Sequence, residues 1–159
     1  MALVFTGTPC KLCGLPLDEN REIDGFLHFV ANAADPLWPL SDGAFHRECL
    51  EKDALGRQAM EFAGIARRRI DPGNRICCID NKPVANPQDY LFIPLLTSDP
   101  NEKVFKYNFL TFNRNNIGKW ENRKEFIEDL KEFNNQGKWK DFQSHKFMDH
   151  LISEFQINR

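Results

Sequence analysis

The side chains best suited to chemistry in this chain are two pairs of metal-binding residues. Cys10 and Cys13 are separated by two residues, and His46 and Cys49 have the same separation. Thiolates and imidazoles paired at this spacing are the usual ligands of structural zinc, which binds four of them in a tetrahedron. Because four protein ligands leave no position for an activated water, we expect one structural Zn²⁺ ion rather than a catalytic metal.

The sequence around each pair predicts the local structure that would position it. Gly14 directly follows the first pair, which is typical of a zinc knuckle, where a tight turn brings backbone amides close to sulfur. Residues 41–43 provide turn and capping chemistry before the second pair. In the first turn of a helix there, His46 and Cys49 would share one face. The apolar residues that predict this helix are Leu50, Leu55, Ala59, Phe62 and Ala66.

A strand-like segment, residues 23–30, lies between the two pairs, and an Asp35-Pro36 turn follows it. Knuckle, hairpin and a helix with the second ligand pair together resemble the treble-clef class of zinc fingers. The order C-x2-C then H-x2-C resembles the first zinc module of a LIM domain, over about residues 10–66. In LIM domains the two pairs are closer and a second complete ligand set follows directly. The resemblance therefore implies only the fold class and the four ligand roles.

A weaker copy of the pattern begins 67 residues further along the chain. At this offset Cys10 corresponds to Cys77, but the other three ligand positions hold Asp80, Asn113 and Asn116. The surrounding framework persists, since Phe-His-Arg-Glu-Cys-Leu is matched by Phe-Asn-Arg-Asn-Asn-Ile. We therefore predict a duplicated unit whose second copy has lost its metal.

An alternative is a second metal site in the second half. Cys77, Cys78 and Asp80 would form it if His145 or His150 completed the ligand set. Two adjacent cysteines rarely bind the same ion, and no further spacing in the chain matches a known site. The metal-free copy is thus the preferred interpretation.

The second half is more apolar than the first, as a unit held together by packing requires. Residues 90–96 and 104–112 are strand-like, and a helix with apolar residues from Phe126 to Phe133 follows them. Residues 134–137 predict the end of that helix, and a last helix is expected from about Trp139. The predicted fold is α+β. Its parts are a zinc-binding treble-clef-like unit at 1–70, a degenerate repeat of that unit at 71–136 and a packed C-terminal helix at 137–159.

Composition limits the classes of partner. A net charge of −2 over 159 residues, with a pI near 6.1, gives no general attraction to phosphate. The N-terminal residues lack a signal-peptide pattern, and no apolar run approaches the roughly 20 residues that span a bilayer. We therefore expect a cytoplasmic protein. Five cysteines, an odd number, favour metal binding and free thiols over a disulfide framework.

Two surface features are candidates for partner binding. Arg67, Arg68 and Arg69 form the only concentrated positive patch, which fits either a phosphate contact or the solvated end of a helix. Trp38 lies in an apolar loop, where it serves either local packing or the docking of a protein partner.

No catalytic motif is present, so we do not expect an enzyme. The treble-clef framework also occurs in HNH-type nucleases, but here His28 and Asn32 match such a site by residue type only. The favoured function is a zinc-stabilised protein-protein interaction module, such as an inhibitor, an immunity-type protein or an adaptor that occludes its partner. A nucleic-acid-binding zinc-finger protein is the alternative, and an HNH-type nuclease fits less well.

Overall fold

The computed structural model of this protein describes residues 7–18 and 20–156. These residues form two small antiparallel sheets, one in each half of the chain. Strand β1 (Ile23–Gly25) pairs with β2 (Ala44–His46), and β3 (Tyr90–Phe92) pairs with β4 (Thr111–Asn113). Helices follow each sheet. The α+β class expected from the sequence is therefore confirmed.

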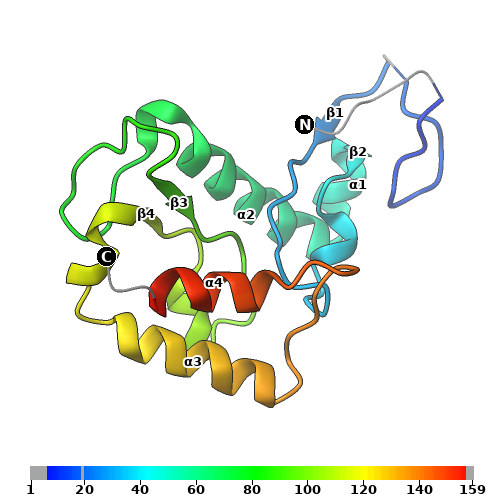
Figure 1. Cartoon of the computed structure of the whole chain (residues 1–159). Helices are drawn as coiled ribbons and strands as arrows, with labels where there is room; N and C mark the ends of the chain where they lie inside the picture. The colour runs from blue at the N-terminus through cyan, green and yellow to red at the C-terminus, as the bar shows by residue number, and fades with distance from the viewer. Residues whose placement is uncertain (1–6, 19, 157–159) are drawn as a thin grey trace.

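The helices connect and cover the two sheets. The α-helices are α1 (Arg47–Lys52), α2 (Ala54–Ile70), α3 (Arg123–Asn135) and α4 (Phe147–Gln156). Short 3₁₀ helices are η1 (Trp38–Leu40), η2 (Pro72–Asn74), η3 (Lys103–Tyr107) and η4 (Arg114–Lys119). Figure 1 shows β1, β2 and α1 at one end of the molecule and β3 and β4 at the other, with α2 running between them and α4 beside α3.

Asp53 divides the predicted N-terminal helix into α1 and α2. Its backbone is extended, and its side chain accepts a hydrogen bond of 2.7 Å from the amide of Gly56 in the first turn of α2. A Cβ atom at Gly56 would lie 2.5 Å from the carbonyl oxygen of Leu50, so only glycine permits this close junction of the two helices.

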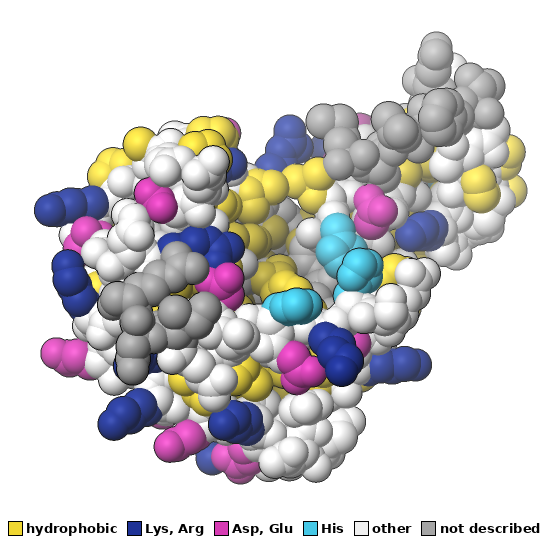
Figure 2. Space-filling model, in the orientation of Figure 1, with side chains coloured by type: hydrophobic (Ala, Val, Ile, Leu, Met, Phe, Trp, Pro, Cys, Tyr) yellow, Lys and Arg dark blue, Asp and Glu magenta, His cyan; other side chains and the backbone are white. Residues whose placement is uncertain are grey.

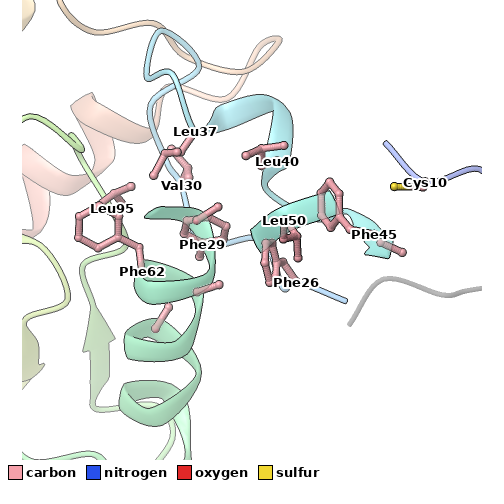
Figure 3. Close-up of a cluster of buried hydrophobic side chains, with 14 of the residues drawn as sticks. Cys10, Phe26, Phe29, Val30, Leu37, Leu40, Phe45, Leu50, Phe62 and Leu95 are labelled. Atoms are coloured by element: carbon pink, nitrogen blue, oxygen red, sulfur yellow. The ribbon is translucent and has the colours of Figure 1, made fainter. Parts of the chain in front are cut away.

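Two buried clusters form the core, and each contains residues from both halves. The first cluster surrounds Phe29 and Phe62 but also includes Leu95 from the second half. Figure 3 shows these three side chains beside one another, with Cys10 at the opposite end of the same cluster. The second cluster surrounds Phe126 and includes Ala31 from the first half. The two halves therefore contribute side chains to a shared core.

Backbone hydrogen bonds reinforce this shared core. Leu95 donates to the carbonyl of Phe29, and Ala31 donates to the carbonyl of Leu95, at 2.9 Å each. The buried carboxylate of Asp35 accepts a hydrogen bond of 2.6 Å from the amide of Ser98. Figure 2 shows a hollow with a hydrophobic floor on the face between the two ends of the molecule.

Several segments differ from the sequence prediction. The strands are shorter than expected, since only Ile23–Gly25 of residues 23–30 and Tyr90–Phe92 of residues 90–96 form them. Residues 104–107 were expected to be a strand but form part of η3, where Val104 and Tyr107, three residues apart, are both buried. The last helix begins at Phe147 rather than near Trp139. Asp141 accepts a hydrogen bond from the amide of Phe147, and residues 142–144 form a bend and a turn. Lys140 cannot start the helix because its backbone pairs with Asn32 and with residue 33.

The backbone hydrogen bonds of the two halves correspond at a constant offset of 67 residues. The same offset relates β1 to β3, β2 to β4 and α1 to η4. The isolated bridge between residues 9 and 16 likewise corresponds to that between residues 76 and 83. Corresponding donor and acceptor pairs are Cys10–Leu15 and Cys77–Lys82, Gly14–Cys10 and Asn81–Cys77, Leu17–Thr8 and Val84–Arg75, Lys11–Ala44 and Cys78–Thr111, Phe26–Gly43 and Ile93–Leu110, and Arg47–Glu22 and Arg114–Asp89.

The helices of the described part of the chain are all too short or too polar to cross a membrane.

The shared core leads to a prediction about cooperativity. Replacing Leu95 by Ala removes a fully buried side chain from the first cluster, so we expect a loss of about 2–5 kcal/mol in the free energy of unfolding. Urea titration followed by circular dichroism should show one transition at a lower midpoint. Leu55→Ala, at a side chain that is 43% exposed, is the control and should change stability by no more than about 0.5 kcal/mol. A Leu95→Ala variant as stable as this control would contradict the shared core.

Candidate metal centre

The four predicted ligands meet at one point of the first half. One ligand atom from each of Cys10, Cys13, His46 and Cys49 lies within 4.8 Å of the others, close enough to surround a single metal ion. Three sulfurs and one imidazole nitrogen are the donor set of a tetrahedral Cys₃His zinc site. In residues 7–18 and 20–156 no other group of three or more His, Cys, Asp or Glu side chains converges in this way.

A tight turn positions the first ligand pair. Gly14 donates a hydrogen bond of 2.8 Å to the carbonyl of Cys10, and Cys10 donates one of the same length to the carbonyl of Leu15. Gly14 has a φ of +74°, a conformation in which other residues are strained. The turn thus places Cys10 and Cys13 on the same side, with their sulfur atoms facing the second pair.

The second pair comes from the junction between β2 and α1. His46 is the last residue of β2 and the N-cap of α1, with extended backbone, and Cys49 lies in the first turn of that helix. The sequence predicts both residues inside the first helical turn, and His46 lies just before that turn. Its side chain still points toward Cys49 because a strand-to-helix junction turns the chain at this residue.

Hydrogen bonding determines which nitrogen of His46 faces the cluster. Nε2 lies 3.2 Å from the carbonyl oxygen of Pro16, which can only accept, so Nε2 carries the proton and donates. Nδ1 therefore has a free lone pair, and it lies 3.5 Å from Sγ of Cys13 and 3.9 Å from Sγ of Cys49. A carbonyl that fixes the imidazole tautomer in this way is a common outer partner of a metal-binding histidine.

Burial and backbone amides affect the thiols differently. Burial raises the pKa of Cys10, but hydrogen bonds from the backbone amides of Cys13, His46 and Leu12 outweigh it and lower the pKa to about 6. Burial raises the pKa of Cys49 to about 11, and its thiol neighbours Cys13 and Cys10 add to the increase. Without a cation, Cys10 therefore ionises readily, whereas Cys49 keeps its proton, in part because a second thiolate would be repelled by the first. A divalent metal ion would offset this repulsion.

The centre has one buried and one accessible side. Cys10 and His46 are buried, Cys49 is half-buried and Cys13 is exposed. A metal ion can enter past Cys13, whereas Cys10 links the centre to the hydrophobic core. A tetrahedral ion would use all four protein ligands and would have no position left for a bound water.

The remaining site candidates lie away from this centre. Trp38 is half-buried and packs against the rings of His28 and Phe142, with ring centroids at 5.1 and 5.2 Å. His28 also contacts Ser41 at 3.4 Å, and burial lowers its pKa. The side-chain amide of Asn32 donates to the carbonyl of residue 138. The two residues that matched a nuclease by type are thus engaged in packing and hydrogen bonding away from the four ligands.

The arginine patch forms the last turn of α2. Arg67, Arg68 and Arg69 are all exposed there, which matches the solvated helix end considered from the sequence. Cys77 is buried and Cys78 is exposed, and neither forms a metal-binding group with His145 or His150 within the described residues.

Sequence reasoning did not identify a groove beside β1. The groove has a volume of about 700 Å³ and lies between β1, α1 and α2. Its apolar lining comes from Phe26, Leu27 and Met60, and Arg67 lies at its α2 side. The lining of the groove comes from β1 and the residues after it, from α1 and from α2, so no local sequence pattern marks it as one surface. Arg67, as part of the predicted patch, was its only signal in the sequence.

Comparisons with protein-family models, with curated proteins and with solved structures found no match for this chain.

The role of the centre in folding can be tested by removing one ligand. Cys13→Ser takes one sulfur from the cluster, so we expect loss of about one equivalent of bound zinc and a clear decrease in the melting temperature, because metal binding and folding share free energy. Elemental analysis and thermal unfolding measure the two effects. Cys78→Ser, at an exposed cysteine outside the cluster, is the matched control and should change neither. Unchanged zinc content in Cys13→Ser would rule out this site.

The raised pKa of Cys49 predicts pH-dependent metal binding. The thiol is protonated at neutral pH in the metal-free chain and must lose its proton to bind an ion, so affinity should rise with pH. We expect at least about a tenfold increase in affinity per pH unit between pH 6 and 8. Calorimetric titration in buffers of different ionisation enthalpy counts the released protons. An affinity independent of pH, without proton release, would contradict thiolate ligation.

Proposed function

We propose that this chain is a zinc-stabilised protein-protein interaction module that acts by occluding part of a protein partner, as an inhibitor, immunity-type protein or adaptor does. In this proposal Cys10, Cys13, His46 and Cys49 hold one structural Zn²⁺ in a treble-clef-like unit. The zinc has no direct contact with the partner; it fixes the junction of β2 and α1. The observation that carries the proposal is the groove between β1, α1 and α2, which this junction shapes.

The groove is suited to an extended segment of another protein. β1 pairs only with β2 among the described residues, so its second edge has no described strand partner. Glu22 and Phe26 make backbone hydrogen bonds toward β2. Because the backbone N–H and C=O groups of successive residues in a strand point to opposite edges, those of Ile23 and Gly25 point away from β2. Ile23 and Gly25 also line the groove. A peptide that pairs with this edge would gain main-chain hydrogen bonds and an apolar floor.

Charge determines the chemistry expected of that segment. Arg47 in the groove is neutralised by ion pairs with Asp24 and Glu22. Arg67, on the α2 side, forms no ion pair with the described residues. Glu51, on the α1 side of the groove, likewise forms no ion pair with the described residues. An extended segment with apolar side chains and an acidic one placed at Arg67, away from Glu51, would therefore complement the groove, and we propose such a segment as the occupant.

The nucleic-acid alternative depends on the patch of Arg67, Arg68 and Arg69. A phosphate-binding surface normally extends as a basic stripe. On the face in Figure 2, acidic and basic side chains are interspersed, which supports the protein-binding proposal over this alternative.

Peptide selection tests the proposed function directly. A library of random peptides displayed on phage is selected against the zinc-loaded full chain, and we expect enriched sequences that combine acidic and apolar residues. Arg67→Glu should weaken their binding by about tenfold or more, because the groove would then carry a like charge. Arg68→Glu, on the same helical turn but outside the groove, is the matched control and should leave binding unchanged.

Two results would contradict this function. Selected peptides that bind equally to both variants would place the binding surface elsewhere. Binding of single-stranded or duplex oligonucleotides that is lost equally in Arg67→Glu and Arg68→Glu, and weakens with salt, would favour the nucleic-acid alternative.

A further inference from the structure

The second half reproduces the unusual backbone positions of the first. Gly14 and Asn81, 67 residues apart, both have positive φ, at 74° and 56°. Asp42 and Phe109 are related in the same way, with φ of 53° and 62°. A positive φ is costly for a bulky side chain such as phenylalanine, so chance agreement at the same offset is a poor explanation.

Buried side chains near the two centres also correspond. Phe45 and Phe112 are both fully buried, one residue before His46 and Asn113 respectively. The residue after each last ligand position is an apolar core residue, Leu50 in the first half and Ile117 in the second. The ligand positions of the second half therefore lie on a backbone and a packed core equivalent to those of the metal centre.

At these positions hydrogen bonds replace the expected metal contacts. The side-chain amide nitrogen of Asn116 lies 3.0 Å from a carboxylate oxygen of Asp80 and 3.9 Å from the sulfur of Cys77. Asn116 corresponds to Cys49, Asp80 to Cys13 and Cys77 to Cys10. One amide group thus joins the same knuckle and helix that a metal ion would join in the first half.

The fourth position no longer takes part. Asn113, which corresponds to His46, turns its side chain to the following turn, where it accepts a hydrogen bond of 3.0 Å from the amide of Asn115. It acts as the N-cap of η4, whereas His46 makes no such capping bond at α1. A residue released from metal binding has taken over a capping role.

Electrostatics are consistent with this replacement. Three thiolates, a neutral imidazole and a dication carry one net negative charge. Asp80 provides one negative charge in the second half and accepts hydrogen bonds from Asn116 and from the amide of Lys82. The second centre therefore reaches the charge of a loaded zinc site without needing a cation.

We propose that Cys77, Asp80 and Asn116 form a metal-free counterpart of the zinc centre, in which the amide of Asn116 bridges the knuckle and η4 in place of the ion, while Asn113 caps η4. The second half is then a copy of the first whose stability does not depend on metal. This inference rests on the zinc centre of the first half, which is part of the proposed function, but not on the groove or on partner binding.

The first test removes the amide bridge. Asn116→Ala loses both side-chain hydrogen bonds, so we expect the melting temperature of the full chain to fall by about 2–8 °C with unchanged zinc content. Asn115→Ala is the matched control, because Asn115 is exposed and contributes only its backbone amide to the described network. Equal melting temperatures for the two variants would overturn the proposal.

The second test restores the metal ligands. A triple variant with Asp80→Cys, Asn113→His and Asn116→Cys should bind one more equivalent of zinc than the wild type, measured by elemental analysis and by cobalt substitution, which gives the visible bands of tetrahedral thiolate coordination. Adding Cys77→Ser should abolish the extra equivalent, whereas adding Cys78→Ser should keep it.

Two outcomes of this second test would overturn the proposal. One is a folded triple variant that binds no additional zinc, and the other is a wild-type chain that already binds two equivalents. If the triple variant does not fold, the comparison of Asn116→Ala with Asn115→Ala decides. Neither test uses the groove or a partner, so failure here is distinct from failure of the proposed function.

Discussion

We propose that the fold depends on a crosslink between a tight knuckle and the start of a short helix. Each half is too small to stabilise such a junction by burial alone, because small units bury little of their surface. In the first half, Cys10, Cys13, His46 and Cys49 converge at this junction and can surround one ion. An ion held there would fix the junction at which β2 ends and α1 begins, beside the groove along β1.

In the proposed account, a metal ion closes this junction in the first half and an amide closes it in the second. The shared core helps to stabilise the second half without a metal. Leu95 packs into the first cluster, and backbone hydrogen bonds join it to Phe29. The more apolar second half supplies aromatic packing around Phe112 and Phe126, both of which contact Phe155 of α4. In the proposed account, such packing lets the amide of Asn116, which donates to Asp80, take the place of an ion. The first half has the complete ligand set.

Much of the site was predictable because it follows from local rules. Paired ligand spacing identified the four-residue cluster, and the apolar period identified α2 and α3. Non-local features were not predictable. η3 replaced a predicted strand because Val104 and Tyr107 both face the core, and α4 begins late because Lys140 pairs with a segment more than 100 residues earlier. The bridging role of Asn116 also required the structure, since asparagine alone carries no ligand signal.

Hydrogen exchange of the full chain, with and without a zinc chelator, tests the central claim most directly. The account predicts that the chelator removes amide protection at residues 9–17 and 44–52 while residues 76–84 and 111–119 keep most of theirs. Equal loss of protection in both segments, or no change in either, would contradict a fold in which metal closes one junction and hydrogen bonds close the other.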